Sequence, residues 1–169
     1  MTHILVTGCN RGIGLALTQA ALARGWDVTG TARDDFEMDG VRVIGCEMAD
    51  TDGIADAFAD LEPLDILINN AGVIGPDRQA PTDMDFDGFR RTLDINVLAP
   101  LAVAQACLPA LRARPGSRIL SVSSQMSWMG YAASDRIAYR ASKSALNKVM
   151  QGLATDLAGE GIAVALVDP

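Results

Sequence analysis

The chain has 169 residues, 49% of them hydrophobic, which fits one globular domain with a substantial core. Its net charge of -7 argues against binding to nucleic acid, which requires a basic surface. Three scattered cysteines without a CxxC pair and a single histidine, His3, argue against a Cys/His metal site. We expect reduced thiols, a cytoplasmic protein and a surface or edge position for His3.

Short apolar runs alternate with segments of helical periodicity along the chain. The run at 4–6 ends at Gly8 and predicts a strand, and the periodic segment 12–24 stops at Gly25 and predicts a helix. No apolar run approaches the roughly 20 residues that span a bilayer. Continuing in chain order, we predict strands at 26–32, 41–46, 64–68, 118–122 and 162–167, helices at 51–61, 85–112 and 136–158, an N-cap at Thr51, loops at 73–83 and 123–135, and a bend or interruption of helix 85–112 near Pro100 and Pro109.

This alternation predicts one α/β domain over the whole chain (1–169), with a doubly wound parallel sheet and helices on both faces, the Rossmann fold. Such sheets bind ligands beyond the carboxyl ends of their strands. Four residues directly follow predicted strands and should gather along one edge of the sheet: Gly8, Asn70, Ser124 and Asp168. The sequence stops directly after a strand, where this fold usually continues, so we expect a C-terminal part that is truncated or unobserved.

A glycine-rich loop follows the first strand: Thr7-Gly8-Cys9-Asn10-Arg11-Gly12-Ile13-Gly14. Gly8 permits a tight turn, Gly12 lets the backbone approach phosphates, and Gly14 lets the next helix pack near the sheet. The N-terminus of that helix then offers unpaired N–H groups to a pyrophosphate. The spacing GxxxGxG differs from the GxGxxG of other dinucleotide sites, and glycine-rich turns after strands are common, so the loop alone is weak evidence.

The residues after the second strand bear on the choice of dinucleotide. The acidic residue that would hydrogen-bond a ribose 2′-hydroxyl is missing, since Ala32 ends the strand and Arg33 follows. Arg33, with Arg11 from the glycine loop, favours a 2′-phosphate and hence NADP(H) over NAD(H). Alternatively, both are ordinary surface arginines, and Asp34 and Asp35 neutralise Arg33.

A Tyr-x-x-x-Lys pair lies on the predicted helix 136–158. Tyr139 and Lys143 are one turn apart on one helix face, so the ammonium can favour the ionised form of the phenol. Such a tyrosine can donate a proton to a carbonyl oxygen during reduction or accept one during oxidation, while a serine hydroxyl holds the substrate oxygen. The pair gains weight from the glycine loop and from the serines upstream: Ser121, Ser123, Ser124 and Ser127.

Together these motifs resemble the classical short-chain dehydrogenase/reductase family, most of all its branch of C-factor, sniffer and carbonyl reductases. The matching segments occur in family order: Thr7–Gly14, Asn69–Gly72, Asn96 within 93–97, Ser123-Ser124 and Tyr139–Lys143. The resemblance implies Tyr139 as the general acid/base and Lys143 as the group that activates the phenol and binds the nicotinamide ribose. Ser124 would bind and polarise the substrate oxygen, and Asn96 would hold a water in a proton relay.

The resemblance also implies a cofactor site. Glu47 and Met48 stand where the family usually has Asp-Val beside the adenine, and the segment 70–72 would line the adenosine ribose while Asn69 props the neighbouring strand. Pro169 matches the start of a segment that flanks the nicotinamide. The expected cofactor-binding residues are Gly8, Asn10, Arg11, Gly12, Ile13, Gly14, Arg33, Glu47, Met48, Asn70, Ala71, Gly72, Tyr139, Lys143 and Pro169.

The choice of catalytic serine has two candidates. Many members carry it thirteen residues before the tyrosine, where this chain has Met126. Ser124 lies fifteen residues before Tyr139 and Ser127 twelve, and we favour Ser124 because the branch resembled here tolerates a longer loop. Three residues after this loop either form an apolar wall of the substrate pocket or pack against the neighbouring helix: Trp128, Met129 and Tyr131.

We therefore expect an NADPH-dependent oxidoreductase that reduces a ketone or aldehyde to an alcohol, acting on a small molecule and not on nucleic acid or a membrane. The alternative is a dinucleotide-binding regulatory or signalling protein of the same fold with little or no turnover. Family members usually associate through two long helices, here 85–112 and 136–158, so we expect a homodimer or homotetramer.

Overall fold

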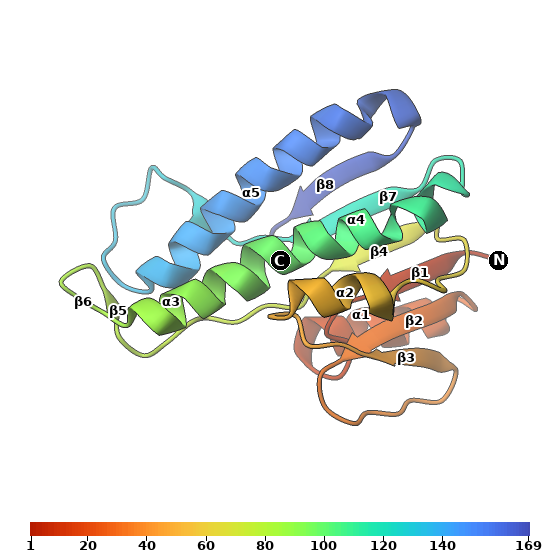
Figure 1. Cartoon of the computed structure of the whole chain (residues 1–169), viewed down its shortest axis with the longest axis horizontal. Coiled ribbons are helices and arrows are strands. Elements are labelled where there is room, and N and C mark those ends of the chain that lie inside the picture. The colour runs from red at the N-terminus through yellow and green to blue at the C-terminus, as the bar shows by residue number, and fades with distance from the viewer.

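The computed structural model describes residues 1–169 and is built on a six-stranded parallel sheet (Figure 1). The strands lie in the order β3-β2-β1-β4-β7-β8. From β1 the chain adds β2 and β3 on one side of the sheet, and then β4, β7 and β8 on the other side. The strand order therefore reverses between β1 and β4, and such a point forms a crevice at the carboxyl end of the sheet. The six strands are β1 (His3–Val6), β2 (Asp27–Ala32), β3 (Val41–Gly45), β4 (Ile66–Asn69), β7 (Arg118–Val122) and β8 (Ala163–Val167).

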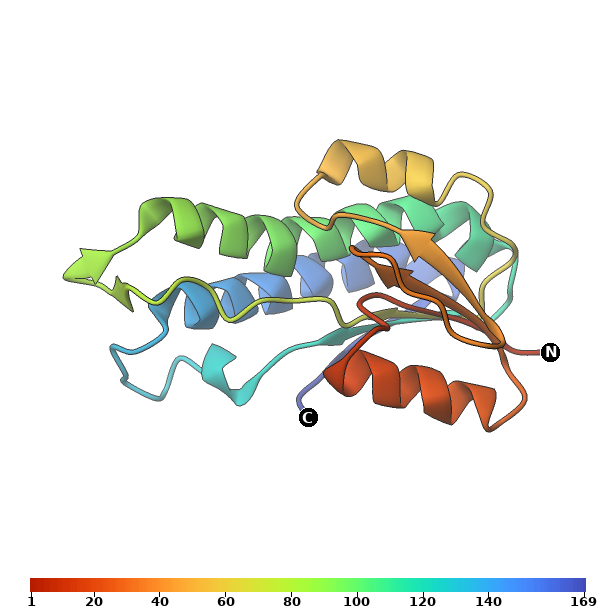
Figure 2. The ribbon, with the colours of Figure 1, turned by 90° about the horizontal axis from the view of Figure 1, so that it is seen from below.

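Helices cover both faces of the sheet (Figure 2). Strand side chains alternate between the two faces, so Ile4 and Val6 pack in a small cluster with Ala21 of α1, while Leu5 joins the larger core cluster on the other face. The helix α1 lies alone on its face, and α2, α4 and α5 cover the other. The helices are α1 (Gly12–Leu22), α2 (Thr51–Ala57), α3 (Phe86–Leu93), α4 (Ala99–Arg112) and α5 (Ile137–Leu157). The Rossmann fold predicted from the sequence is confirmed.

The long helix predicted at 85–112 is irregular just before Pro100, as expected, whereas Pro109 lies inside a regular helix. A π turn, η1 (Asp94–Leu98), joins α3 to α4, and Pro100 lies in the first turn of α4, where a missing N–H is tolerated. The continuous helix Phe86–Arg112 is long and apolar enough to cross a bilayer by length and composition alone, contrary to our expectation. Its most apolar 18-residue stretch has a mean hydropathy of 1.4, and half of that stretch is buried in the protein.

Three local predictions are wrong. His3 is buried, not superficial, because β1 is a central strand, and its ring contacts the Pro63 carbonyl oxygen and the Thr29 hydroxyl. The N-cap of α2 is Asp50, whose carboxylate accepts the N–H of Gly53. The predicted loop 73–83 contains a small antiparallel hairpin, β5 (Gln79–Ala80) and β6 (Asp83–Met84).

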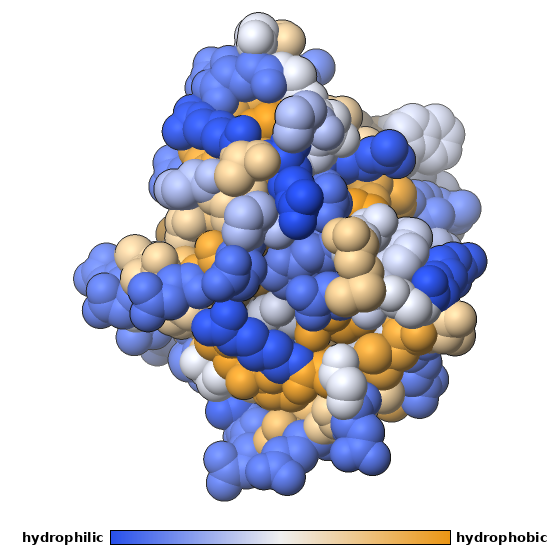
Figure 3. Space-filling model, turned by 90° about the vertical axis from the view of Figure 1, so that its right-hand side faces the viewer, coloured by the Kyte–Doolittle hydropathy of each residue, from blue (hydrophilic) through white to orange (hydrophobic).

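The two ends of the sheet differ in character. The strands begin at the end drawn in Figure 3, where hydrophilic residues predominate around a band of hydrophobic ones. At the other end the glycine loop, the segment after β4, the loop after β7 and the C-terminus come together beyond the strands. Edge strand β8 is largely exposed, with Leu166 at 39% and Val167 at 40% exposure.

Candidate active site

The glycine loop is held in a shape that only glycine permits at two positions. Gly8 and Gly12 have φ angles of 70° and 54°, in the left-handed region. At Gly14 the constraint is space, since a Cβ there would lie 2.0 Å from the carbonyl oxygen of Gly8. The Asn70 side chain donates to the carbonyl oxygens of Thr7 (2.8 Å) and Gly8 (3.2 Å) and so fixes the turn from the neighbouring strand.

The N-terminus of α1 fits the pyrophosphate of a dinucleotide. Its N-cap residue Arg11 makes no capping hydrogen bond, and the first turn contains no acidic side chain. Arg11, Gly12 and Ile13 are all exposed. The first N–H groups of the helix are therefore open and lie at the positive end of its dipole, where an anion is stabilised.

The segment after β4 packs against this loop through its backbone. The Thr7 hydroxyl accepts the N–H groups of Asn70 and Ala71, both at 3.0 Å. Because both Nδ2 hydrogens of Asn70 are donated to the glycine loop, a contact with a ribose is left to its Oδ1, to the backbone, to Ala71 and to the exposed Gly72. Asn69 is buried and donates to the Pro100 carbonyl oxygen, which agrees with a propping role.

The residues expected around the adenosine carry charge at the surface. Arg33 is exposed and donates to both carboxylate oxygens of Asp34, at 3.3 and 3.1 Å, which lowers the pKa of that carboxyl group. Glu47 accepts the N–H of Ala49 and lies 3.5 Å from a guanidinium nitrogen of Arg91. Met48 is buried beside it. The structure thus contains the pairing of Arg33 with Asp34 that the sequence offered as an alternative.

Tyr139 and Lys143 share the first turns of α5. The Lys143 Nζ lies 5.7 Å from the centre of the Tyr139 ring and donates to the carbonyl oxygen of Val122 at 2.7 Å. Lys143 is only 4% exposed, and this burial lowers the pKa of its ammonium group to about 8. A phenol, a buried ammonium and the carboxyl end of β7 thus meet in one place.

The buried Asn96 joins three segments of the site. Its Oδ1 accepts the N–H of Val73, and its Nδ2 donates to the Val73 carbonyl oxygen and to the Ser142 hydroxyl, all within 2.9 Å. Ser142 in turn donates to the carbonyl oxygen of Tyr139 at 2.7 Å. Both Nδ2 hydrogens of Asn96 are used in these contacts, and the residue lies in the π turn, where backbone hydrogen bonding departs from the α pattern.

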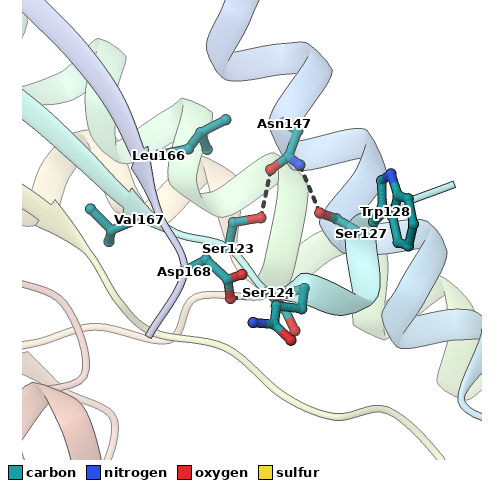
Figure 4. Close-up of a pocket in the computed structure, with 9 residues that line it drawn as sticks. Ser123, Ser124, Ser127, Trp128, Asn147, Leu166, Val167 and Asp168 are labelled. Atoms are coloured by element: carbon teal, nitrogen blue, oxygen red, sulfur yellow. Dashed lines mark hydrogen bonds between the residues drawn. The ribbon is translucent and has the colours of Figure 1, made fainter. Parts of the chain in front are cut away.

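Both candidate serines line one cavity of about 350 Å³ at the end of β7 (Figure 4). Asn147 of α5 accepts a hydrogen bond from Ser123 at 2.6 Å and donates one to Ser127 at 2.9 Å. Ser124 accepts the N–H of Met126, and Asp168 accepts the N–H of Gln125. The serine loop is therefore tied to α5 and to the C-terminus, and the hydroxyl groups of both candidate serines, Ser124 and Ser127, each accept one hydrogen bond.

The three large side chains after the serine loop are exposed: Trp128, Met129 and Tyr131. Trp128 is 68% exposed and lines the same cavity, while Met129 lines a neighbouring groove of about 580 Å³ between α5 and β8. Tyr131 is stacked under the Arg140 guanidinium, 5.6 Å from its ring centre. These residues lie at the rim of the site and not in the core.

Three residues that tie the site together escaped sequence reasoning: Gln79, Ser142 and Asn147. Ser142 and Asn147 lie within the helix that carries the Tyr-x-x-x-Lys motif, and helical spacing from Tyr139 could have placed Asn147 on the same side. Gln79 has no local signal, since its partner is 60 residues away.

The chain belongs to the short-chain dehydrogenase family, whose sequence profile matches residues 2–169. It is 33% identical to a 3-dehydrosphinganine reductase of Arabidopsis thaliana, with 99% of this chain aligned. It is 43% identical to C-signal of Myxococcus xanthus over 63% of its length. A short chain dehydrogenase from Burkholderia cenocepacia, solved in complex with NADP, superposes with a TM-score of 0.88 at 26% identity, covering 99% of this chain and 71% of that one.

The alignments cover only part of the relatives. The chain spans 54% of the length of the Arabidopsis reductase and 64% of that of C-signal. The chain is thus a member of an oxidoreductase family that binds nicotinamide cofactors, and the family predicted from its motifs is confirmed.

Proposed function

We propose that this protein reduces the carbonyl group of a ketone or aldehyde to an alcohol with NADPH. The observation that carries the proposal is the placement of the Tyr139 phenol beside the buried Lys143 ammonium, at the strand end that also presents Ser124. The reductase name of the Arabidopsis relative supports the direction of the reaction.

The residues of the chain bind the substrate oxygen and supply its proton. The nicotinamide, when bound, supplies the hydride to the carbonyl carbon. Ser124 donates a hydrogen bond to the carbonyl oxygen, and Tyr139 transfers its phenolic proton to that oxygen, which completes the alcohol. Lys143 stabilises the resulting phenolate, because its ammonium is held in a place that water does not screen.

Asn96 contributes to proton supply through its backbone. Its side chain is 1% exposed, both Nδ2 hydrogens are donated to Val73 and Ser142, and Oδ1 accepts the N–H of Val73, so the amide group is engaged within the protein. In the proposed relay its carbonyl group, in the π turn, therefore holds the water that returns a proton toward Lys143.

The proposed cofactor preference rests on charge. The residues that hold the dinucleotide are the glycine loop 8–14 with the N-terminus of α1, the segment 70–72, Glu47 with Met48, and Pro169. Arg33 and Arg11 bind the 2′-phosphate, and Arg33 exchanges its contact with Asp34 for one with the ligand. The NADP in the Burkholderia structure supports this choice.

The experiment is to follow NADPH oxidation with a panel of ketones, aldehydes and quinones, with NADH in parallel. We expect turnover that prefers NADPH and that falls at least about a hundredfold in Tyr139→Phe. Tyr131→Phe is the matched control, because Tyr131 is the only other tyrosine and lies exposed at the rim. Full turnover in Tyr139→Phe would contradict the proposal.

A second function has a specific observation in its favour, which is the 43% identity to C-signal. In this alternative the protein binds a dinucleotide as a regulatory or signalling protein with little turnover. Tight NADPH binding without turnover on any substrate of the panel would support it.

We also propose a cytoplasmic homodimer or homotetramer, associated through the helices 85–112 and 136–158. Sedimentation at micromolar concentration tests this assembly, and a monomer mass alone would contradict it.

A further inference from the structure

The catalytic helix α5 begins without a cap of its own. Its N-cap, Arg136, makes no capping hydrogen bond and is the only non-glycine residue with a positive φ, at 50°. The first hydrogen bond of the helix is donated by Arg140 to the Arg136 carbonyl oxygen. The N–H groups before it, up to that of Tyr139, must therefore find partners elsewhere.

Gln79 supplies the partner for the N–H of Tyr139. Its Oε1 accepts this N–H at 3.2 Å, across 60 residues of sequence. Its Nε2 donates to the carbonyl oxygens of Ile74 (3.1 Å) and Pro76 (2.6 Å). The orientation of the amide is unambiguous, because the reverse would place its oxygen against two carbonyl oxygens. The side chain is 6% exposed, so water does not compete for these bonds.

The loop around Gln79 is shaped to hold this side chain. Gly75 has a φ of 97°, and a Cβ there would lie 3.2 Å from two atoms of the Gln79 amide and 2.9 Å from the Thr92 hydroxyl. The backbone of Gln79 pairs with Met84 in the β5–β6 hairpin. The loop and the hairpin thus present one acceptor, the Gln79 Oε1, to the first turn of α5.

We infer that Gln79 is a positioning residue for Tyr139, acting as the N-terminal cap of α5 from a distant loop. It touches no reacting atom. It fixes the backbone of the tyrosine and so sets where the phenol stands relative to Lys143 and the substrate oxygen. The inference rests on the proposed role of Tyr139 as proton donor, because only then does the position of that ring affect turnover.

The test is Gln79→Met, which keeps the length of the side chain and removes every hydrogen bond. We expect kcat to fall about tenfold with KM for NADPH unchanged, since a small displacement of a proton donor slows chemistry more than binding. Amide hydrogen exchange at Tyr139 should accelerate about fivefold or more, because a buried hydrogen bond is lost. Exchange in the interior of α5 should stay slow.

Two further variants separate this role from a general loss of structure. Arg78→Ala removes an exposed ion pair with Asp83 in the same hairpin and should change neither kcat nor exchange. Gly75→Ala places a methyl group against the Gln79 amide and the Thr92 hydroxyl on a backbone with a φ of 97°, so it should reproduce both effects of Gln79→Met together with a loss of stability, which urea denaturation measures separately.

The outcomes are distinguishable from those of the proposed function. If Tyr139→Phe abolishes turnover but Gln79→Met leaves kcat unchanged, the positioning role is overturned and the proposed function stands, even where exchange accelerates. If exchange at Tyr139 is unchanged in Gln79→Met, the cap itself is overturned. Full turnover in Tyr139→Phe overturns the proposed function and, with it, the positioning role.

Discussion

The N-termini of helices α1 and α5 both lack a capping side chain of their own, but only α5 receives one from a distant segment. At α1 the first N–H groups stay open toward solvent beside the exposed Gly12. At α5 the buried Gln79 reaches across 60 residues to fill the equivalent place. An open helix start suits a ligand that arrives and leaves, whereas a filled one suits a proton donor that must not move.

The same contrast runs through the surroundings of the two helices. The glycine loop is shaped by its own glycines and by one neighbour, Asn70. The helix α5 is held by side chains from three distant segments, which are Gln79, Asn96 through Ser142, and the loop after β7 through Asn147. A substitution in the glycine loop should therefore have a large effect, whereas a substitution that removes one of the contacts of α5 should have a partial effect, because the other contacts remain.

The largest effect is expected at Gly14. In Gly14→Ala the new methyl group would overlap the Gly8 carbonyl oxygen, so we expect a loss of about 3 kcal/mol in the free energy of unfolding, and weakened NADPH binding. Urea denaturation measures the first and fluorescence titration the second. Gly152→Ala is the matched control in another helix, where a methyl group meets nothing and should be neutral or slightly stabilising. Equal stability of the two variants would show that the loop tolerates more than its geometry suggests.

Next in size is the difference between the two serines. Ser124→Ala should lower kcat about a hundredfold with little loss of cofactor binding, because it removes a hydrogen bond to the substrate oxygen. Ser127→Ala should mainly leave the Asn147 amide without an acceptor and cost about 1 kcal/mol of stability. Steady-state kinetics and urea denaturation of both variants show which serine binds the substrate oxygen. Loss of activity in Ser127→Ala with full activity in Ser124→Ala would reverse the assignment.

The burial of Lys143 predicts a smaller effect on stability that depends on pH. Between about pH 8 and the ordinary pKa of 10.5, the unfolded chain keeps a proton that the folded chain releases. Lys143 therefore makes the free energy of unfolding rise with pH in this window, by up to about 1.4 kcal/mol per pH unit. Burial raises the pKa values of the cysteine thiols, which act in the opposite direction above pH 9.

A comparison of the wild type with Lys143→Met separates the contribution of the lysine from that of the thiols, because both proteins contain the same three cysteines. We expect the stability of the wild type relative to the variant to be flat below pH 8 and to rise above it. Urea denaturation of the protein without cofactor across this range provides the measurement. A difference that stays constant through the window would mean that the ammonium is better solvated than its burial indicates.

The smallest effect is expected at the exposed Arg33. Asp34→Asn removes the carboxylate that holds the guanidinium, so KM for NADPH should fall by up to about fivefold, while KM for NADH stays the same. Asp35→Asn is the control, since Asp35 makes no contact with Arg33. An equal change for both cofactors would argue that Arg33 does not bind the 2′-phosphate.

Much of the fold and of the candidate site could be predicted from local patterns. The alternation of apolar runs and helical periodicity placed the six strands of the parallel sheet and four helical segments, with ends that shift by a few residues, and the segment 85–112 contains both α3 and α4. The positions of Tyr139 and Lys143 on one helix face follow from helical spacing alone. The hairpin at 79–84 was missed because its strands are two residues long and lie in a segment rich in Gly and Pro.

The sequence by itself determined the strands of the main sheet and the helical segments, that the strands run parallel, and which residues meet at the carboxyl edge of the sheet, because these follow from periodicity and from spacing within one element. Only the tertiary structure decided that His3 is buried between strands, that the Asn96 amide serves Val73 and Ser142, and that Gln79 caps α5. Each of these depends on hydrogen-bond partners more than 20 residues away, and no local pattern specifies which distant polar group will meet a given donor.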